Sequence, residues 1–163
     1  MVKRGLRLGR LLQARGAFLA VAESCTGGLI AKDITDVPGS SQWFERGLVT
    51  YSNAAKQELL GVSPELLEQS GAVSRECALA MARGLLVMTP AHYAVAVTGI
   101  AGPGGGTPGK PVGLVWVAWA RRGGKVEAKK LFLKGSRSAI RRKSADAALD
   151  GLIARVKDAG RRP

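Results

Sequence analysis

Hydrophobic residues in this chain follow two patterns that alternate along the sequence. Within residues 3–15, leucines recur at helical spacing, which predicts an amphipathic helix. Residues 17–22 are continuously apolar, as in a short strand that is buried on both faces. The glycine-rich turn at 26–28 then leads into a helical pattern over 29–34. The pattern therefore predicts a strand, a tight turn and a helix in direct succession.

The transition from strand to helix recurs later in the chain. Residues 47–51 are typical of a second strand, and Asn53 is placed to cap a helix that runs to about Leu60. Residues 93–97 form a third apolar stretch, which predicts a strand that ends in a glycine-rich loop. Further helices are expected to begin at Ser63, Ser74 and Ser136.

Two stretches of alternating hydrophobicity, 112–120 and 126–133, flank Gly123-Gly124 and predict a β-hairpin. Helices separate the earlier strands, so those strands are expected to be parallel. The expected fold is α/β: a three-layer α/β/α sandwich with a mixed, mostly parallel sheet plus an antiparallel hairpin. The chain has 163 residues, of which 46% are hydrophobic, and we expect one domain over residues 1–163.

Charge and cysteine content narrow the class of protein. The net charge of +13 favours anionic ligands, and both phosphorylated small molecules and nucleic acid fit that requirement. The two cysteines are not spaced as metal ligands and suggest a reducing compartment. No apolar run approaches the roughly 20 residues of a spanning helix. We therefore expect a soluble, cytoplasmic protein with no metal site and no membrane partner.

Candidate chemistry lies where the strands end, because ligands of an α/β sheet gather at the carboxyl ends of its parallel strands. Three side chains come shortly after the three apolar strands: Ser24, Lys56 and Thr98. If those strands are parallel neighbours, the three side chains converge at one edge of the sheet.

A serine needs a base to become a nucleophile, and the usual base is histidine. The single histidine, His92, precedes a strand, which places it at the opposite end of the sheet from Ser24. Lys56 is the alternative base, because the positive end of a helix that begins near Asn53 disfavours the ammonium form and lowers its pKa. An ordinary solvated lysine is the competing interpretation, and the residues alone leave both open.

The turn after Ser24 also has two interpretations. Free N–H groups of Thr26, Gly27 and Gly28 at the start of a helix are suited to bind the oxyanion of a tetrahedral intermediate. The same glycines are what a tight turn requires, whatever its function. Cys25 is a rival nucleophile, but no histidine lies at that end of the sheet to generate a thiolate, which favours a small packed side chain.

The loop over 99–111 partly matches phosphate-binding motifs. The spacing G-x-x-x-x-G-K ends at Lys110, but Pro111 replaces the hydroxyl residue that would meet magnesium, and a strand follows instead of a helix. The exposed N–H groups of the loop are still suited to hold a phosphate, and a flexible connection is the alternative. Arg137 and Arg141, one helical turn apart, are candidates to supply charge for that phosphate.

Several segments together resemble one known family. They are Ala22-Glu23-Ser24-Cys25-Thr26-Gly27-Gly28, Pro38-Gly39-Ser40-Ser41 with Trp43-Phe44, Val49-Thr50-Tyr51-Ser52-Asn53-Ala54-Ala55-Lys56, Gly71-Ala72-Val73-Ser74, Thr98-Gly99-Ile100-Ala101-Gly102-Pro103 and Lys110-Pro111-Val112-Gly113. Over roughly residues 5–157 the chain resembles the C-terminal domain of the CinA (competence/damage-inducible protein) family, whose stand-alone members are nicotinamide-nucleotide amidases. Fused members carry a larger N-terminal domain, whose activity we expect to be absent here.

The resemblance implies an amidohydrolase that converts nicotinamide mononucleotide to nicotinate mononucleotide and ammonia in pyridine nucleotide recycling, without a cofactor. It assigns the catalytic serine and lysine to Ser24 and Lys56. A further family arginine near the start of the last helix matches Arg137 best. Ser136 stands where family members often carry an aspartate, so Arg141 stays an alternative.

The resemblance also implies a binding site for the nucleotide. Tyr51 is expected to stack on or position the nicotinamide ring, and Arg137 to bind the phosphate. The other residues expected to contact the substrate are Thr98, Gly99, Gly102, Gly104 and Arg141.

Two other functions stay open on the sequence. The charge of +13 and the family's name fit a nucleic-acid-associated accessory protein in competence or DNA damage. A nucleotide-binding regulator without catalysis is the second alternative. A homodimer is expected, because small α/β enzymes commonly form symmetric dimers.

Overall fold

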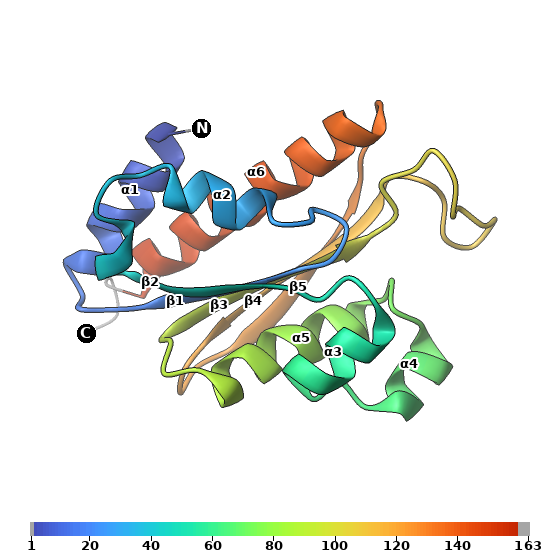
Figure 1. The fold of residues 1–163 in the computed structure, drawn as a ribbon, viewed down its shortest axis with the longest axis horizontal. Coiled ribbons are helices and arrows are strands. Elements are labelled where there is room, and N and C mark those ends of the chain that lie inside the picture. The colour runs from blue at the N-terminus through green and yellow to red at the C-terminus, as the bar shows by residue number, and fades with distance from the viewer. Residues whose placement is uncertain (1, 160–163) are drawn as a thin grey trace.

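The computed structural model describes residues 2–159, which form a five-stranded sheet between two layers of helices (Figure 1). Across the sheet the strands follow the order β2 (Phe44–Val49), β1 (Leu19–Glu23), β3 (Tyr93–Gly99), β4 (Leu114–Arg121) and β5 (Val126–Phe132). β1 pairs in parallel with β2 and β3, whereas β4 pairs antiparallel with β3 and β5. The predicted mixed sheet with an antiparallel hairpin is therefore confirmed.

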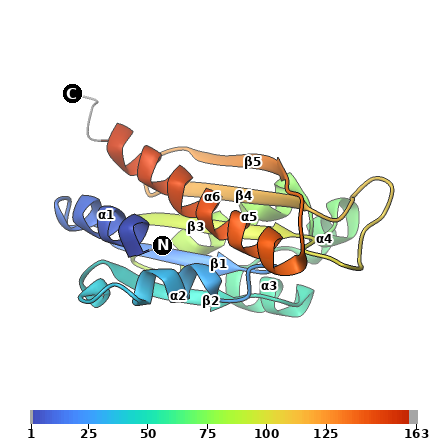
Figure 2. The same ribbon diagram turned by 90° about the horizontal axis from the view of Figure 1, so that it is seen from above.

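The helices cover both faces of the sheet, as the sequence pattern predicted (Figures 1 and 2). One layer consists of α1 (Val2–Gln13), α2 (Leu29–Thr35) and α6 (Arg137–Asp158). The other layer consists of α3 (Asn53–Leu60), α4 (Pro64–Ser70) and α5 (Arg75–Met88). A single turn of 3₁₀ helix, η1 (Ser40–Gln42), precedes β2 and was not predicted.

The two faces of the sheet carry side chains of different size. Leu19 and Val21 of β1 point into the core beneath α1, α2 and α6, whereas Ala20 and Ala22 point toward α5. Successive side chains of a β-strand point to opposite faces of the sheet, which places the large and the small residues on different faces. The α5 face is lined mainly by alanines of three strands: Ala20, Ala22, Ala94, Ala96, Ala118 and Ala120. Small side chains leave room for α5 to lie close to the sheet.

Helix α3, which carries Lys56, is held in place by a close contact with α5. A Cβ atom added to Gly84 of α5 would lie 2.0 Å from the carbonyl oxygen of Leu60, so only glycine permits this approach. The N-cap of α3 is Ser52, whose hydroxyl accepts a hydrogen bond from the Ala55 N–H. The prediction that Asn53 caps this helix is wrong, because Asn53 is already its first helical residue.

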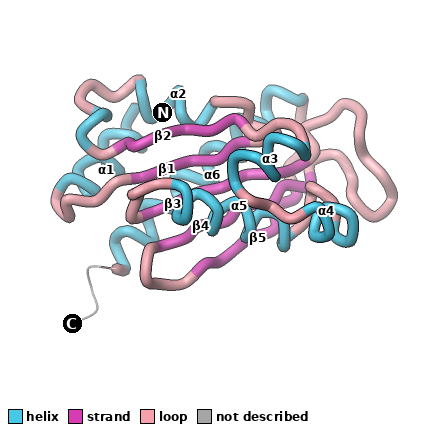
Figure 3. Tube along the Cα trace, turned by 60° about the horizontal axis from the view of Figure 1, so that its bottom comes forward, coloured by secondary structure: helices cyan, strands magenta, loops and turns pink. Residues whose placement is uncertain are grey.

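The loops that follow β1, β2 and β3 lie together at one end of the sheet, beside α3 and α4 (Figure 3). The long loop between β3 and β4 projects beyond the body of the molecule at the same end (Figures 1 and 3). Within residues 2–159, no helix has both the length and the apolar character that crossing a membrane requires.

Candidate active site

Ser24 and Lys56 contact each other at the carboxyl end of the parallel strands. The Lys56 Nζ lies 3.2 Å from the Ser24 Oγ, within hydrogen-bonding distance. The same Nζ donates to the carbonyl oxygens of Thr50 at 2.8 Å and Tyr51 at 3.3 Å. The lysine amine is therefore held by several fixed backbone groups with the serine hydroxyl beside it.

The parallel register of the strands explains this meeting. Glu23, the last residue of β1, is level with Val49 of β2 and Val97 of β3. Pairing continues one step beyond β1, since the Ser24 N–H donates to the Val97 carbonyl at 2.9 Å. Helix α3 begins directly after this level and brings Lys56 back over the strand ends. The predicted convergence at one edge of the sheet is thus what the structure shows for these two side chains.

Lys56 is buried, with only 1% of its surface exposed. Desolvation by burial lowers the pKa of its ammonium group below that of an ordinary lysine. In the described part of the chain, no carboxylate forms an ion pair with it. The alternative of a solvated surface lysine is therefore excluded, and the environment favours a neutral amine that can accept a proton.

Cys25 lies next to the serine but is packed inside the protein. It is 5% exposed, and burial raises the pKa of its thiol to about 12. A thiol with such a pKa stays protonated near neutral pH and is a poor nucleophile. Cys25 therefore behaves as a small apolar side chain.

Two N–H groups of the turn after Ser24 already donate hydrogen bonds within the protein. Gly27 donates to a backbone carbonyl within the turn at 3.1 Å, and Gly28 donates to the Glu23 carboxylate at 3.1 Å. Both were expected to supply free oxyanion donors, and both N–H groups are engaged instead. Within residues 2–159, the N–H groups of Cys25 and Thr26 donate to no protein acceptor.

Ser24 and Lys56 line a cleft of about 290 Å³. Six of the residues predicted to be functional also line it: Tyr51, Thr98, Gly99, Gly102, Gly104 and Arg137. The sequence reasoning assigned Asn53 to helix capping and missed its position in this cleft. Ser52 was the signal in the sequence that could have shown this. Because a serine can cap the helix, the side chain of Asn53 is left free for another role.

The two candidate arginines of α6 occupy different positions. Arg137 lines the cleft, where its guanidinium donates to the Gly102 carbonyl at 2.6 Å and to the Tyr51 hydroxyl at 3.0 Å. Arg141 donates to the Thr26 carbonyl at 2.7 Å and is not among the residues that line the cleft. Arg137 therefore faces the space for a substrate, and Arg141 supports the turn.

Thr98 and the glycines after it shape the wall of the cleft. The Thr98 hydroxyl donates to the Ala72 carbonyl at 2.8 Å, which ties the end of β3 to the segment before α5. Gly102 has a positive φ of 78°, and a Cβ atom there would lie 2.5 Å from a methyl group of Val112. The loop can follow this path only with glycine at that position.

His92 lies at the amino end of β3, away from Ser24. Its Nδ1 accepts a hydrogen bond from the Phe18 N–H at 3.0 Å, and the two rings stack. It has no access to the serine and serves to join the starts of β1 and β3.

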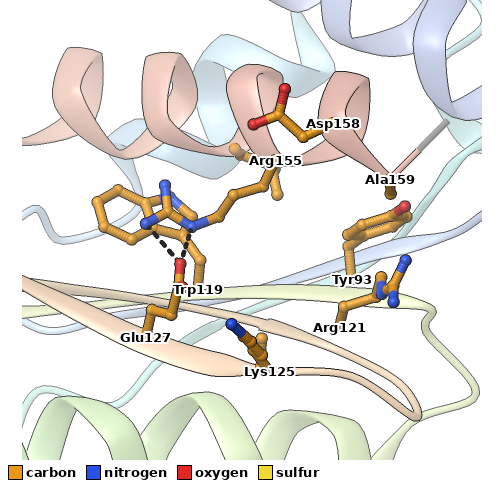
Figure 4. Close-up of a pocket in the computed structure, with 10 residues that line it drawn as sticks. Tyr93, Trp119, Arg121, Lys125, Glu127, Arg155, Asp158 and Ala159 are labelled. Atoms are coloured by element: carbon orange, nitrogen blue, oxygen red, sulfur yellow. Dashed lines mark hydrogen bonds and ion pairs between the residues drawn. The ribbon is translucent and has the colours of Figure 1, made fainter. Parts of the chain in front are cut away.

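A smaller hollow of about 160 Å³ lies at this opposite end of the sheet, between the β4–β5 hairpin and the end of α6 (Figure 4). Arg155 lies 4.0 Å from the centre of the Trp119 ring and forms an ion pair with Glu127 at 3.0 Å. In residues 2–159, no group of three or more potential ligands could hold a metal ion.

A mixed sheet with a serine and a buried lysine in contact at the carboxyl ends of its parallel strands defines an α/β protein with a hydrolase-like site. The chain belongs to the CinA C-terminal domain family, which matches residues 3–156. It is 54% identical over 147 residues to the nicotinamide-nucleotide amidohydrolase PncC of Pseudomonas putida, covering 90% of this chain and 91% of that protein. The corresponding protein of Escherichia coli K12 is 51% identical over 146 residues, which cover 90% of this chain and 88% of the relative.

A solved structure confirms the fold. The competence/damage-inducible protein CihA of Agrobacterium tumefaciens superimposes with a TM-score of 0.91 at 47% identity, covering 94% of this chain and 93% of that one. The resemblance deduced from the motifs is thus confirmed, and the protein is an amidohydrolase.

Proposed function

We propose that the protein hydrolyses the carboxamide of nicotinamide mononucleotide, with Ser24 as nucleophile and Lys56 as general base. The 3.2 Å contact between the two side chains in an open cleft is the observation that carries this proposal. The names of the PncC relatives support the substrate.

The reaction proceeds through an acyl-enzyme. Neutral Lys56 takes the hydroxyl proton of Ser24 as the Oγ attacks the amide carbon, and the carbonyl oxygen becomes an oxyanion. The carbon–nitrogen bond then breaks, and the Lys56 ammonium returns its proton to the leaving nitrogen, which departs as ammonia. A water molecule, deprotonated by Lys56, attacks the ester carbon, and Lys56 returns that proton to the Ser24 Oγ as the ester bond breaks. This releases nicotinate mononucleotide and restores Ser24 and neutral Lys56.

The oxyanion is bound by a backbone N–H group of the turn. Of the three groups expected from the sequence, only Thr26 retains a free N–H, but Thr26 is fully buried and does not line the cleft. The free N–H of Cys25, which lines the cleft next to the nucleophile, is the better placed donor. A donor preorganised in this way stabilises the charge that develops only in the transition state.

Arg137 and Tyr51 provide the binding site for the rest of the nucleotide. Arg137 has no carboxylate partner within residues 2–159, so its charge is available to a phosphate. Tyr51 is 59% exposed at the rim, where its ring can stack on nicotinamide. The glycines at 99, 102 and 104 let the loop backbone approach the phosphate closely.

The direct test is ammonia release from nicotinamide mononucleotide by the purified protein. We expect Ser24→Ala and Lys56→Ala to lose at least about a thousandfold in kcat, because the nucleophile and its base act as one unit. Ser41→Ala and Lys129→Ala, which change the same residue types on the exposed surface, should retain wild-type turnover. Full activity in both dyad variants would refute the mechanism. Thermal stabilisation by the nucleotide without any ammonia would instead indicate a non-catalytic regulator.

A further inference from the structure

Glu23 is a buried carboxylate directly before the nucleophile. It is the last residue of β1 and is 1% exposed. No lysine or arginine within residues 2–159 forms an ion pair with it. A charge buried without a counterion must be stabilised by hydrogen bonds, and those of Glu23 all come from backbone groups.

These hydrogen bonds come from the start of helix α2. One carboxylate oxygen accepts from the N–H groups of Gly28 and Ile30, each at 3.1 Å, and the other accepts from Ala31 at 2.8 Å. Gly28 is the N-cap of α2 and has no side chain to cap the helix. Glu23 therefore acts as the cap from outside the helix, and its negative charge matches the positive end of the helix dipole.

The same contacts hold both ends of the catalytic turn. Glu23 belongs to the strand, and the groups that it binds belong to the helix, so Ser24 and the three residues after it form a closed loop between them. The Gly27 N–H is used within the loop, and Arg141 holds the Thr26 carbonyl from α6 at 2.7 Å. Only the N–H groups of Cys25 and Thr26 are left without an acceptor among the described residues.

We propose that Glu23 is a positioning residue for amide hydrolysis. It withdraws the Gly28 N–H from the reaction and fixes the turn so that the N–H group of Cys25, which lines the cleft, is left to bind the oxyanion. This inference rests on the proposed function, because an oxyanion hole matters only if Ser24 attacks a carbonyl. Glu23 does not touch the substrate and acts through the shape of the turn.

The substitution Glu23→Gln tests the proposal, since it keeps the size and one acceptor oxygen but removes the charge and points an NH₂ group at a backbone donor. We expect kcat for ammonia release to fall about a hundredfold, as when an oxyanion donor is lost. KM should change less than about threefold, because Arg137 and Tyr51 are untouched.

Asp33→Asn is the matched control. Asp33, on α2, is another buried carboxylate and is 2% exposed, but it pairs with Arg142 and makes no hydrogen bond to the turn. Both variants are assayed at a temperature at which circular dichroism shows them to be folded. Equal loss of kcat in the two variants, or wild-type kcat in Glu23→Gln, would overturn the proposal. Wild-type protein that releases no ammonia would instead overturn the proposed function.

Hydrogen exchange gives a second readout that needs no variant. In the wild type, the amides of Gly28, Ile30 and Ala31 should be protected more strongly than the amide of Cys25, which lines the cleft and has no acceptor among residues 2–159. The reverse pattern would contradict the role of Glu23 even if Glu23→Gln fails to fold. In a folded Glu23→Gln protein, the three protected amides should exchange faster while those in the middle of α5 do not change.

Discussion

At the scale of single residues, Lys56 combines two features that a general base needs. Its side chain is enclosed, so burial lowers the pKa of its amine, and its Nζ is held 3.2 Å from the Ser24 hydroxyl, which loses a proton in the proposed mechanism. Neither feature depends on a histidine. The environment of one buried side chain therefore allows serine chemistry in a chain whose single histidine lies at the other end of the sheet.

The lowered pKa predicts the pH dependence of the reaction. Below the pKa of Lys56 in the folded protein, the amine is protonated and cannot accept the proton of Ser24, so kcat/KM should rise with pH through that value. Because burial lowers this pKa, the rise should be complete below the pH at which an ordinary lysine titrates.

A pH profile of ammonia release measures this rise. The Lys56→Arg variant is the control and should be inactive at every pH, since a guanidinium group does not lose its proton. A rise centred at the pKa of an ordinary lysine would mean that burial does not tune the base.

At the scale of secondary structure elements, the site depends on how closely helices approach one another. Helix α3 reaches its position because α5 presents Gly84 to the carbonyl of Leu60. Sequence patterns predicted both helices, but the contact between them is formed by residues far apart in the chain. The placement of Lys56 is therefore a property of the packed pair and not of α3 alone.

Gly84→Ala tests this dependence. Helix propensity favours alanine by up to about 1 kcal/mol, but the added Cβ would lie 2.0 Å from Leu60 O. We expect a net loss of about 1–3 kcal/mol in the free energy of unfolding, because α3 must move away. Ammonia release should fall as well, because Lys56 moves with the helix.

Urea unfolding and turnover measure the two effects. Gly109→Ala, in a loop where nothing lies within 4 Å of the added atom, should leave both unchanged. Wild-type stability in Gly84→Ala would show that the helices do not depend on this contact.

At the scale of the whole molecule, the fold gathers residues from three distant parts of the chain at one edge of the sheet. Ser24, Lys56 and Arg137 follow or lie near the ends of separate strands, and together they line one cleft. The chain as a whole carries a net charge of +13, which attracts anions to the protein. That attraction affects the encounter with a nucleotide and leaves the chemical step unchanged.

An anionic nucleotide substrate should therefore have a salt-dependent KM. We expect KM to rise severalfold between about 20 and 300 mM salt, because counterions screen surface charges over a Debye length of roughly 10 Å. The value of kcat should stay constant, since the buried dyad is screened much less. The Arg137→Gln variant should show a higher KM with a weaker salt dependence.

Turnover measured across a salt series tests this expectation, and constant KM would contradict it. Binding of a duplex oligonucleotide over the same salt range tests the competing hypothesis that the chain is a nucleic-acid-associated protein. A nucleic-acid protein would bind the duplex tightly, with an affinity that falls steeply as salt increases.

The sequence by itself determined the order and type of the main elements, because hydrophobic periodicity is a local property that survives tertiary packing. The strand predicted at 93–97 is β3, and the hairpin at 112–120 and 126–133 is β4 and β5. Sequence also singled out Ser24 and Lys56, since parallel strands place the residues that follow them at one edge.

Only the tertiary structure decided which groups are free to act. The N–H groups of Gly27 and Gly28 are engaged because of where the Ser24 carbonyl and the Glu23 carboxylate lie, and Arg137 lines the cleft because α6 begins there. These outcomes depend on contacts between residues far apart in sequence or on the path of one turn. Hydrophobic periodicity carries no information about either.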